Sequence, residues 1–144
     1  MEFEHKVQLD CYHKVAALMK ELFGEQVQTR DDGPLFGLPM GSAFVQVGVW
    51  PWGTDNAVVM TRALVVREVE LTPELMHYLL RKNDEMRYGA FGLDNDGDIF
   101  FQYAVVGTTC GKEELKASVL AVGSVADRLD DEIVSRWGGR RAFD

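Results

Sequence analysis

The chain has 144 residues, of which 47% are hydrophobic and 26% are charged, and its formal net charge is −8 at pH 7. This length suits one domain, residues 1–144, with a core of its own, and the negative charge argues against nucleic acid or an anionic membrane as the main partner. No apolar stretch approaches the ~18 residues of a membrane helix. The N-terminus lacks the cationic start of a signal peptide, and the two cysteines form no disulfide framework. We therefore expect a cytoplasmic protein.

The first predicted helix runs from about Asp10 to Phe23, where apolar residues recur three and four positions apart. Gly24 follows the last of them and is a typical helix stop. The next stretch, residues 25–41, is rich in glycine, proline and aspartate. We interpret it as an irregular connection with room for one short edge strand.

An antiparallel hairpin is predicted next. Residues 42–50 alternate strictly between two sides, and residues 57–66 form the second strand. The turn cluster Pro51–Asn56 joins them and places Trp50 and Trp52 at the hairpin tip. Tryptophans at a tip either anchor a partner or cap the end of the core, and the sequence favours neither interpretation.

A short helix and a second hairpin follow. Thr72 suits the N-cap and Pro73 the first helical position, and we expect this helix to end near Asn83. Residues 88–93 then pair with residues 98–106 across an Asp-Gly turn.

A long amphipathic helix begins near residues 110–112 and stops at Gly138. The acids Glu113 and Glu114 occupy its first turn, where negative charge is favourable. Its apolar stripe fits a helix lying along a sheet better than a coiled-coil seam, because only about three heptads exist. The stripe comprises Leu115, Val119, Val122, Ala126, Leu129, Ile133 and Trp137.

These elements predict one α+β domain with the order α-β-β-β-α-β-β-α. Its antiparallel sheet carries the N- and C-terminal helices packed on one face. Because side chains alternate along a strand, one set of positions forms the core face under these helices. That set is Val45, Val47, Val59, Ala63, Phe101, Tyr103 and Val105.

The opposite face of the predicted sheet is mixed. Each of the three best strands places a polar residue at its centre, namely Gln46, Arg62 and Gln102. The apolar residues on the same side are Phe44, Trp50, Val58, Met60, Leu64 and Phe100. Because monomers rarely expose large apolar patches, we expect a cover for this face. A second copy of the chain, a segment of a partner and the chain's own helix at 73–82 are the three alternatives.

No catalytic residues, cofactor site or metal site are predicted. Asp94–Asp98 invites comparison with a calcium-binding loop, but aligning Gly97 with the invariant glycine leaves Gly92 and Tyr103 at essential ligand positions. A tight turn explains these acids better. Cys110 lies near a helix N-terminus, where the pKa of a thiol falls. No histidine partner is predicted for it, so a thiol enzyme is the least supported alternative.

The element order resembles the YbjN-type domain, which shares the fold of the type III secretion chaperones. The likeness lies in residues 83–139. It consists of Asn83, the strand Phe91–Asp94 with its Asp-Gly turn, the strand Ile99–Val106, the acidic start Glu113–Leu115, Ala126–Asp127 and Gly138–Gly139. The chain departs from the family pattern in its long Gly/Pro connection and in its Trp-Pro-Trp turn.

The resemblance implies a cytoplasmic bacterial protein, often a homodimer, that holds a peptide or protein partner through apolar surface. Members are described as chaperone-like or as regulators of sensory transduction, and no catalytic residue exists in the family to carry over. We accordingly predict a non-enzymatic binding module for a protein or peptide client, with a structural homodimer as the alternative. The predicted partner-binding residues are Phe44, Gln46, Trp50, Trp52, Val58, Met60, Arg62, Leu64, Phe100 and Gln102, the polar ones fixing register by hydrogen bonds.

Overall fold

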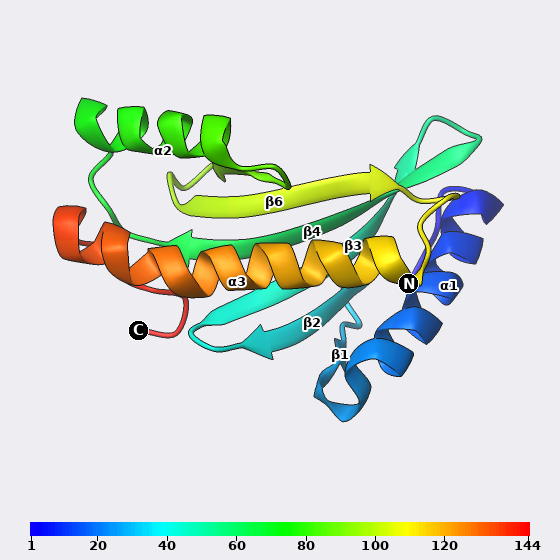
Figure 1. The fold of residues 1–144 in the computed structure, drawn as a ribbon. Helices are drawn as coiled ribbons and strands as arrows, with labels where there is room; N and C mark the ends of the chain where they lie inside the picture. The colour runs from blue at the N-terminus through cyan, green and yellow to red at the C-terminus, as the bar shows by residue number, and fades with distance from the viewer.

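Six antiparallel strands form a single sheet, in the spatial order β1-β2-β3-β4-β6-β5, and the helices pack against it (Figure 1). The computed structural model describes all residues, 1–144. Its elements are α1 (Lys6–Phe23), the 3₁₀ turn η1 (Gly24–Gln26), β1 (Gln28–Thr29), β2 (Leu35–Met40), β3 (Ala43–Trp52), β4 (Asn56–Val66), α2 (Pro73–Glu85), β5 (Ala90–Leu93), β6 (Ile99–Val106) and α3 (Lys112–Trp137). The predicted α+β architecture is confirmed, with β1 as one additional short strand.

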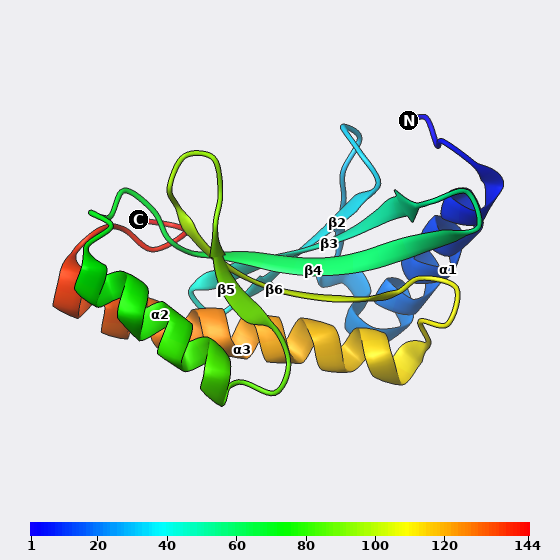
Figure 2. The same cartoon turned by 90° about the horizontal axis from the view of Figure 1, so that it is seen from above.

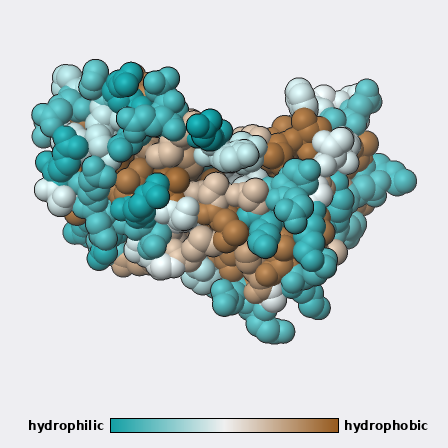
Figure 3. All heavy atoms as spheres, in the orientation of Figure 1, coloured by the Kyte–Doolittle hydropathy of each residue, from teal (hydrophilic) through white to brown (hydrophobic).

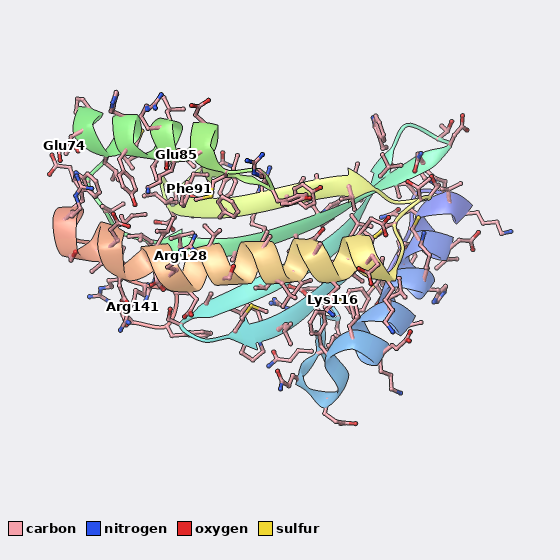
Figure 4. All side chains as sticks on the ribbon, in the orientation of Figure 1. Glu74, Glu85, Phe91, Lys116, Arg128 and Arg141 are labelled. Carbon is pink, nitrogen blue, oxygen red and sulfur yellow. The ribbon has the colours of Figure 1, made fainter.

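All three helices lie on the same side of the sheet (Figure 2). The long helix α3 runs along the middle of this side, with α1 at one end and α2 beside it (Figures 1 and 2). Tyr78 of α2 packs against Trp137 of α3, with ring centroids 5.0 Å apart, and Phe91 lies between α2 and the sheet (Figure 4). The chain's own short helix therefore does not cover the mixed face, and that alternative is wrong.

The core lies between the sheet and the helices, as the alternation predicted. Val45, Val47, Val59, Ala63 and Phe101 are buried, while Tyr103 and Val105 are half-buried against the same cluster. The α3 stripe from Leu115 to Ile133 is buried against them, and Trp137 is half-buried. Viewed from this side, hydrophilic side chains cover α2 and the outer surface of α1, and hydrophobic atoms show in the furrows (Figure 3).

Two predicted boundaries were wrong, and the short strand for which 25–41 had room is present but lies inside the sheet rather than at its edge. The first helix begins at Lys6 rather than near Asp10, because His5 caps it: His5 Nδ1 accepts a hydrogen bond from the Gln8 backbone N–H at 3.2 Å. The connection 25–41 holds a six-residue strand, β2, which pairs with β3 along its whole length. Pro51 and Trp52 belong to β3 rather than to a turn, since they pair with Ala57 and Asn56.

Both edges of the sheet are blocked against a further strand. At the β5 edge, the side-chain amide of Asn83 pairs with Phe91 as a neighbouring strand would: Phe91 N–H donates to Asn83 Oδ1 at 2.7 Å, and Asn83 Nδ2 donates to the Phe91 carbonyl at 3.2 Å. At the other edge β1 covers Phe36 and Gly37, and Pro39 beyond it has no N–H to offer. These features occupy part of each sheet edge and hinder the addition of a further strand there.

A buried carboxyl fixes the turn between β2 and β3 onto α3. Ser42 Oγ lies 2.9 Å from Asp127 Oδ1 and 2.5 Å from Asp130 Oδ2. One hydroxyl donates only one hydrogen bond, so both contacts are satisfied when Asp130 is protonated and donates to Ser42. Burial raises the pKa of Asp130, whereas hydrogen bonds from Ser42 lower the pKa of the exposed Asp127.

Asn83→Ala removes both hydrogen bonds to Phe91, and we expect it to lower the free energy of unfolding by about 1–3 kcal/mol. It also bares the edge of β5, so self-association should increase. Urea denaturation and sedimentation velocity measure the two effects. Asn83→Gln, whose longer side chain misplaces the amide, is the matched control for polarity. An Asn83→Ala protein with unchanged stability and unchanged sedimentation would contradict the proposed role.

Asp130→Asn tests the protonated state of Asp130. A carboxyl whose pKa is raised in the folded state contributes most at low pH, and that contribution is lost as pH rises through the folded pKa. Asparagine keeps a hydrogen-bond donor at all pH values. The variant's free energy of unfolding, measured relative to the parent by denaturant titration from pH 4 to pH 8, should therefore rise with pH and level off once the pH has passed the folded pKa of Asp130. A difference that stays constant or falls over this range would show that Asp130 is ionised in the fold.

Candidate functional site: the open face of the sheet

The face of the sheet opposite the helices, here called the open face, carries its side chains in four rows that cross the strands. The register pairs Trp50 with Val58 and Val58 with Val106 in the first row. The second row is Leu35, Gly48, Met60 and Ala104; the third is Gly37, Gln46, Arg62, Gln102 and Ala90; the fourth contains Phe44, Leu64, Phe100 and Gly92. The ten predicted site residues therefore share one continuous surface, with Trp52, which pairs with Asn56, one step beyond the first row at the end of the hairpin.

The polar row divides this surface. Gln46 and Gln102 stand directly opposite Arg62 on the neighbouring strands. Arg62 Nε and Nη2 both donate to Gln102 Oε1, at 3.0 and 2.7 Å, and its guanidinium carbon lies 3.8 Å from the centre of the Phe100 ring. The stacked cation shields one face of that ring. Arg62 Nη1 and the Gln46 amide make no hydrogen bond within the chain and are available to a partner.

The aromatic rings of the open face lie over glycines. An ideal Cβ on Gly37 would lie 2.4 Å from Phe44 Cζ, and one on Gly92 would lie 2.5 Å from Phe100 Cζ. Trp50 lies over Gly48 in the same way, its Nε1 falling 2.6 Å from such a Cβ. Each ring therefore rests on bare backbone, which covers part of its apolar surface without any helix. Phe44 and Phe100 are half-buried as a result, and Trp50 remains 40% exposed.

Two hollows flank the polar row. The first, of about 420 Å³, is lined by Phe44, Gln46, Arg62, Leu64, Phe100, two aspartates of the β5–β6 turn, and Ala142 with Phe143 from the end of the chain. The second, of about 290 Å³, is lined by Leu35, Gln46, Gly48, Trp50, Met60 and Arg62. Leu64 lines the first hollow and Met60 the second; they lie four residues apart on β4, which is roughly 13 Å along the strand.

Projecting turns border the open face. The β5–β6 turn and the β1–β2 connection both stand up on the side away from the helices (Figure 2). In the first of them, Asp94 Oδ1 accepts hydrogen bonds from the backbone N–H groups of Asp96 and Asp98, each at 2.9 Å. Asp98 in turn accepts from the Glu68 N–H at 3.0 Å. These carboxylates hold the turn in shape, as the interpretation of this motif as a tight turn predicted.

The two cysteines lie away from the open face. Cys11 and Cys110 are both buried, and burial is the largest cause that raises the pKa of each thiol. A reactive cysteine needs the opposite shift. The structure therefore gives no support to the thiol-enzyme alternative, despite the position of Cys110 just before α3.

Sequence reasoning missed several residues of the site. Leu35 lay in a stretch interpreted as irregular, although its alternation with Phe36 and Leu38 is a strand signal in a short run. Ala104 and Val106 continue the pattern of Gln102 along β6 and were identifiable from it. Phe143 follows the last helix, and no local pattern places it near Phe44.

No helix is long and apolar enough to span a membrane.

Gly37→Ala tests the packing of the rings on glycine. The new methyl group would overlap the Phe44 ring, so the ring must rotate away and expose its lower face to water. We expect the free energy of unfolding to fall by about 1–3 kcal/mol, measured by urea denaturation. Gly33→Ala, where a Cβ would meet only Leu35 Cδ1 at 3.7 Å, is the control and should change little. Equal effects of the two substitutions would contradict this packing.

The comparisons with known proteins agree with this geometry. A search of curated proteins returned no match. A family model described as TY-Chap1, the type III secretion system (YopN, CesT) and YbjN peptide-binding chaperone 1, matches residues 10–144. That range includes every strand, the whole open face, α2, α3 and α1 except for its first four residues. The chain therefore belongs to this family of peptide-binding chaperones, as its resemblance to the YbjN-type domain predicted.

Proposed function

We propose that the chain binds an amphipathic segment of another protein on the open face and acts as a chaperone or regulator of that protein. The observation that carries the proposal is the pair of hollows on either side of the polar row, on a face that no helix of the chain covers. Apolar side chains of the partner enter the hollows over Phe44 and Met60. Polar atoms of the partner pair with Arg62 Nη1 and with the Gln46 amide.

The blocked edges of the sheet favour a helical partner segment. A strand added to an edge forms backbone hydrogen bonds with the sheet, but Asn83 closes the β5 edge and β1 with Pro39 closes the other. An extended segment lying on the face would leave its backbone groups without partners from the sheet. A helix satisfies its own backbone, and residues seven or eight positions apart on it lie roughly 10–12 Å apart. That spacing is close to the separation along β4 of Leu64 and Met60, which line the two hollows.

A second copy of the chain is the competing occupant of the open face. The family resemblance leads us to expect a homodimer, and a dimer that closes this face would leave no room for a client. Sedimentation velocity on the purified protein, combined with the binding experiment below, separates the two functions. Affinity purification followed by mass spectrometry then identifies the partner. The identity of the partner tests two expectations from the resemblance, a role in signalling and a location in the cytoplasm.

Met60→Asp tests the proposed function. The probe is a fluorescein-labelled 18-residue peptide of leucine and lysine with leucines at helical spacing, and the same composition in strict alternation is its control. Met60 lines the second hollow, and burying an unpaired carboxylate there should weaken binding of the helical peptide at least tenfold, measured by fluorescence anisotropy. The added negative charge attracts a cationic peptide, so charge alone would change the affinity in the opposite direction.

Leu120→Asp is the matched control, because Leu120 is 43% exposed on α3 and away from the open face. It adds the same charge and should leave binding of the cationic peptide unchanged or slightly tighter, never weaker. Circular dichroism and thermal denaturation confirm that both variants are folded, and Met60→Lys serves as a second variant. Equal affinities of the parent, Met60→Asp and Met60→Lys for the peptide would rule out the open face as its binding site.

A further inference from the structure

The segment that follows α3 passes the end of β4 and reaches the open face. Gly138 and Gly139 make this turn with φ angles of 84° and 88°, a backbone region that favours glycine. A Cβ on Gly139 would lie 2.8 Å from Val66 Cγ1 and 2.9 Å from the Arg67 carbonyl oxygen. The chain therefore passes β4 closely enough that only glycine fits, and Figure 4 shows Arg141 beyond this turn, below the end of α3.

Polar contacts hold this segment against β4 and α3. Arg67 and Arg140 exchange two backbone hydrogen bonds, each of 2.8 Å. The Arg67 side chain donates to the carbonyl oxygen of Arg141 at 3.4 Å and to that of Asp144. Arg141 donates to Asp131 of α3 at 3.0 Å and to the side chain of Asp144 at 3.1 Å.

The segment brings one of the protein's own aromatic side chains, Phe143, to the first hollow. Phe143 meets Phe44 edge to face, with ring centroids 6.2 Å apart and an interplanar angle of 80°. Ala142 and Phe143 complete the lining of the hollow together with Leu64 and Phe100. Phe143 nevertheless remains 62% exposed, so the contact is shallow.

We propose that residues 140–144 form a strap that places Phe143 in the first hollow of the open face and is displaced when a partner binds there. This inference rests on the proposed function, because the strap competes for the same hollow. The strap's ion pairs are exposed and each is weak, so release is easy, and the glycine pair provides the hinge.

Limited trypsin digestion tests whether the strap is docked, independently of any partner. Cleavage after Arg140 or Arg141 removes the end of the strap and is followed by intact mass spectrometry. Removing the Phe44 ring in Phe44→Ala, or the side-chain contacts of Arg67 in Arg67→Ala, should speed this cleavage about three- to tenfold. Leu120→Ala, on α3, should leave the rate unchanged. Equal rates in the parent, Phe44→Ala and Arg67→Ala would overturn the strap.

Phe143→Ser then tests competition, using the helical leucine–lysine peptide as the probe and Leu120→Ser as the matched control. Its affinity for the peptide should rise about three- to tenfold above that of the parent, while Leu120→Ser binds as the parent does. Binding by Phe143→Ser alone supports both the strap and the proposed function. Unchanged or weaker binding by Phe143→Ser, with a parent that binds, overturns the strap and leaves the proposed function standing. A peptide that binds neither protein overturns the proposed function, and with it the strap's role.

Discussion

The packing of α3 along one face of the sheet is the interaction on which the rest of the structure depends. Its 26 residues rise about 39 Å, close to the length of β4, and its buried side runs from Leu115 to Ile133 against the central strands. Close approach is built in: a Cβ on Gly123 would lie 2.0 Å from the Met40 sulfur. Because α3 occupies the middle of this face, α1 and α2 pack against the apolar surface that remains beside α3. The opposite face is left to the strands themselves.

A sheet face without helices must remain soluble in water and still be able to bind. Glycines meet the first requirement here, since the Phe44 and Phe100 rings approach Gly37 and Gly92 too closely for a Cβ and bury surface against the backbone. Arg62 covers part of the Phe100 ring, while its Nη1 makes no hydrogen bond within the chain. What remains exposed is divided by a polar row into two apolar hollows rather than one large patch of the kind that drives aggregation. The same arrangement gives a partner two anchor points and a polar centre.

Strand alternation predicted much of this site and element order predicted the fold, each for a physical reason. Side chains two apart share a face, so Gln46, Arg62 and Gln102 were correctly assigned to one side, and the antiparallel register then aligned them in one row. The features that escaped prediction depend on how the chain turns back after a helix, whether the contact is eight residues away, as for Asn83 and Phe91, or far along the sequence, as for Phe143 and Phe44. Asn83 closes an edge only because β5 returns beside α2, and Phe143 reaches Phe44 only because Gly138 and Gly139 redirect the chain. The side of the sheet that α2 covers is likewise set by tertiary packing against Trp137, which no local pattern encodes.

The position of Arg62 bears on what the open face accepts. A twofold dimer that buried both hollows would place the polar row of one copy against that of the other, because the row lies between the hollows and an isologous interface pairs a surface with itself. Two guanidinium groups would then approach each other in a desolvated interface, where like charges cost several kcal/mol. A partner segment that brings carbonyl or carboxylate oxygens to this row meets no such cost and satisfies Arg62 Nη1 and Gln46. The chemistry at the centre of the face therefore favours a different chain over a second copy, and a homodimer formed through another surface leaves the open face free.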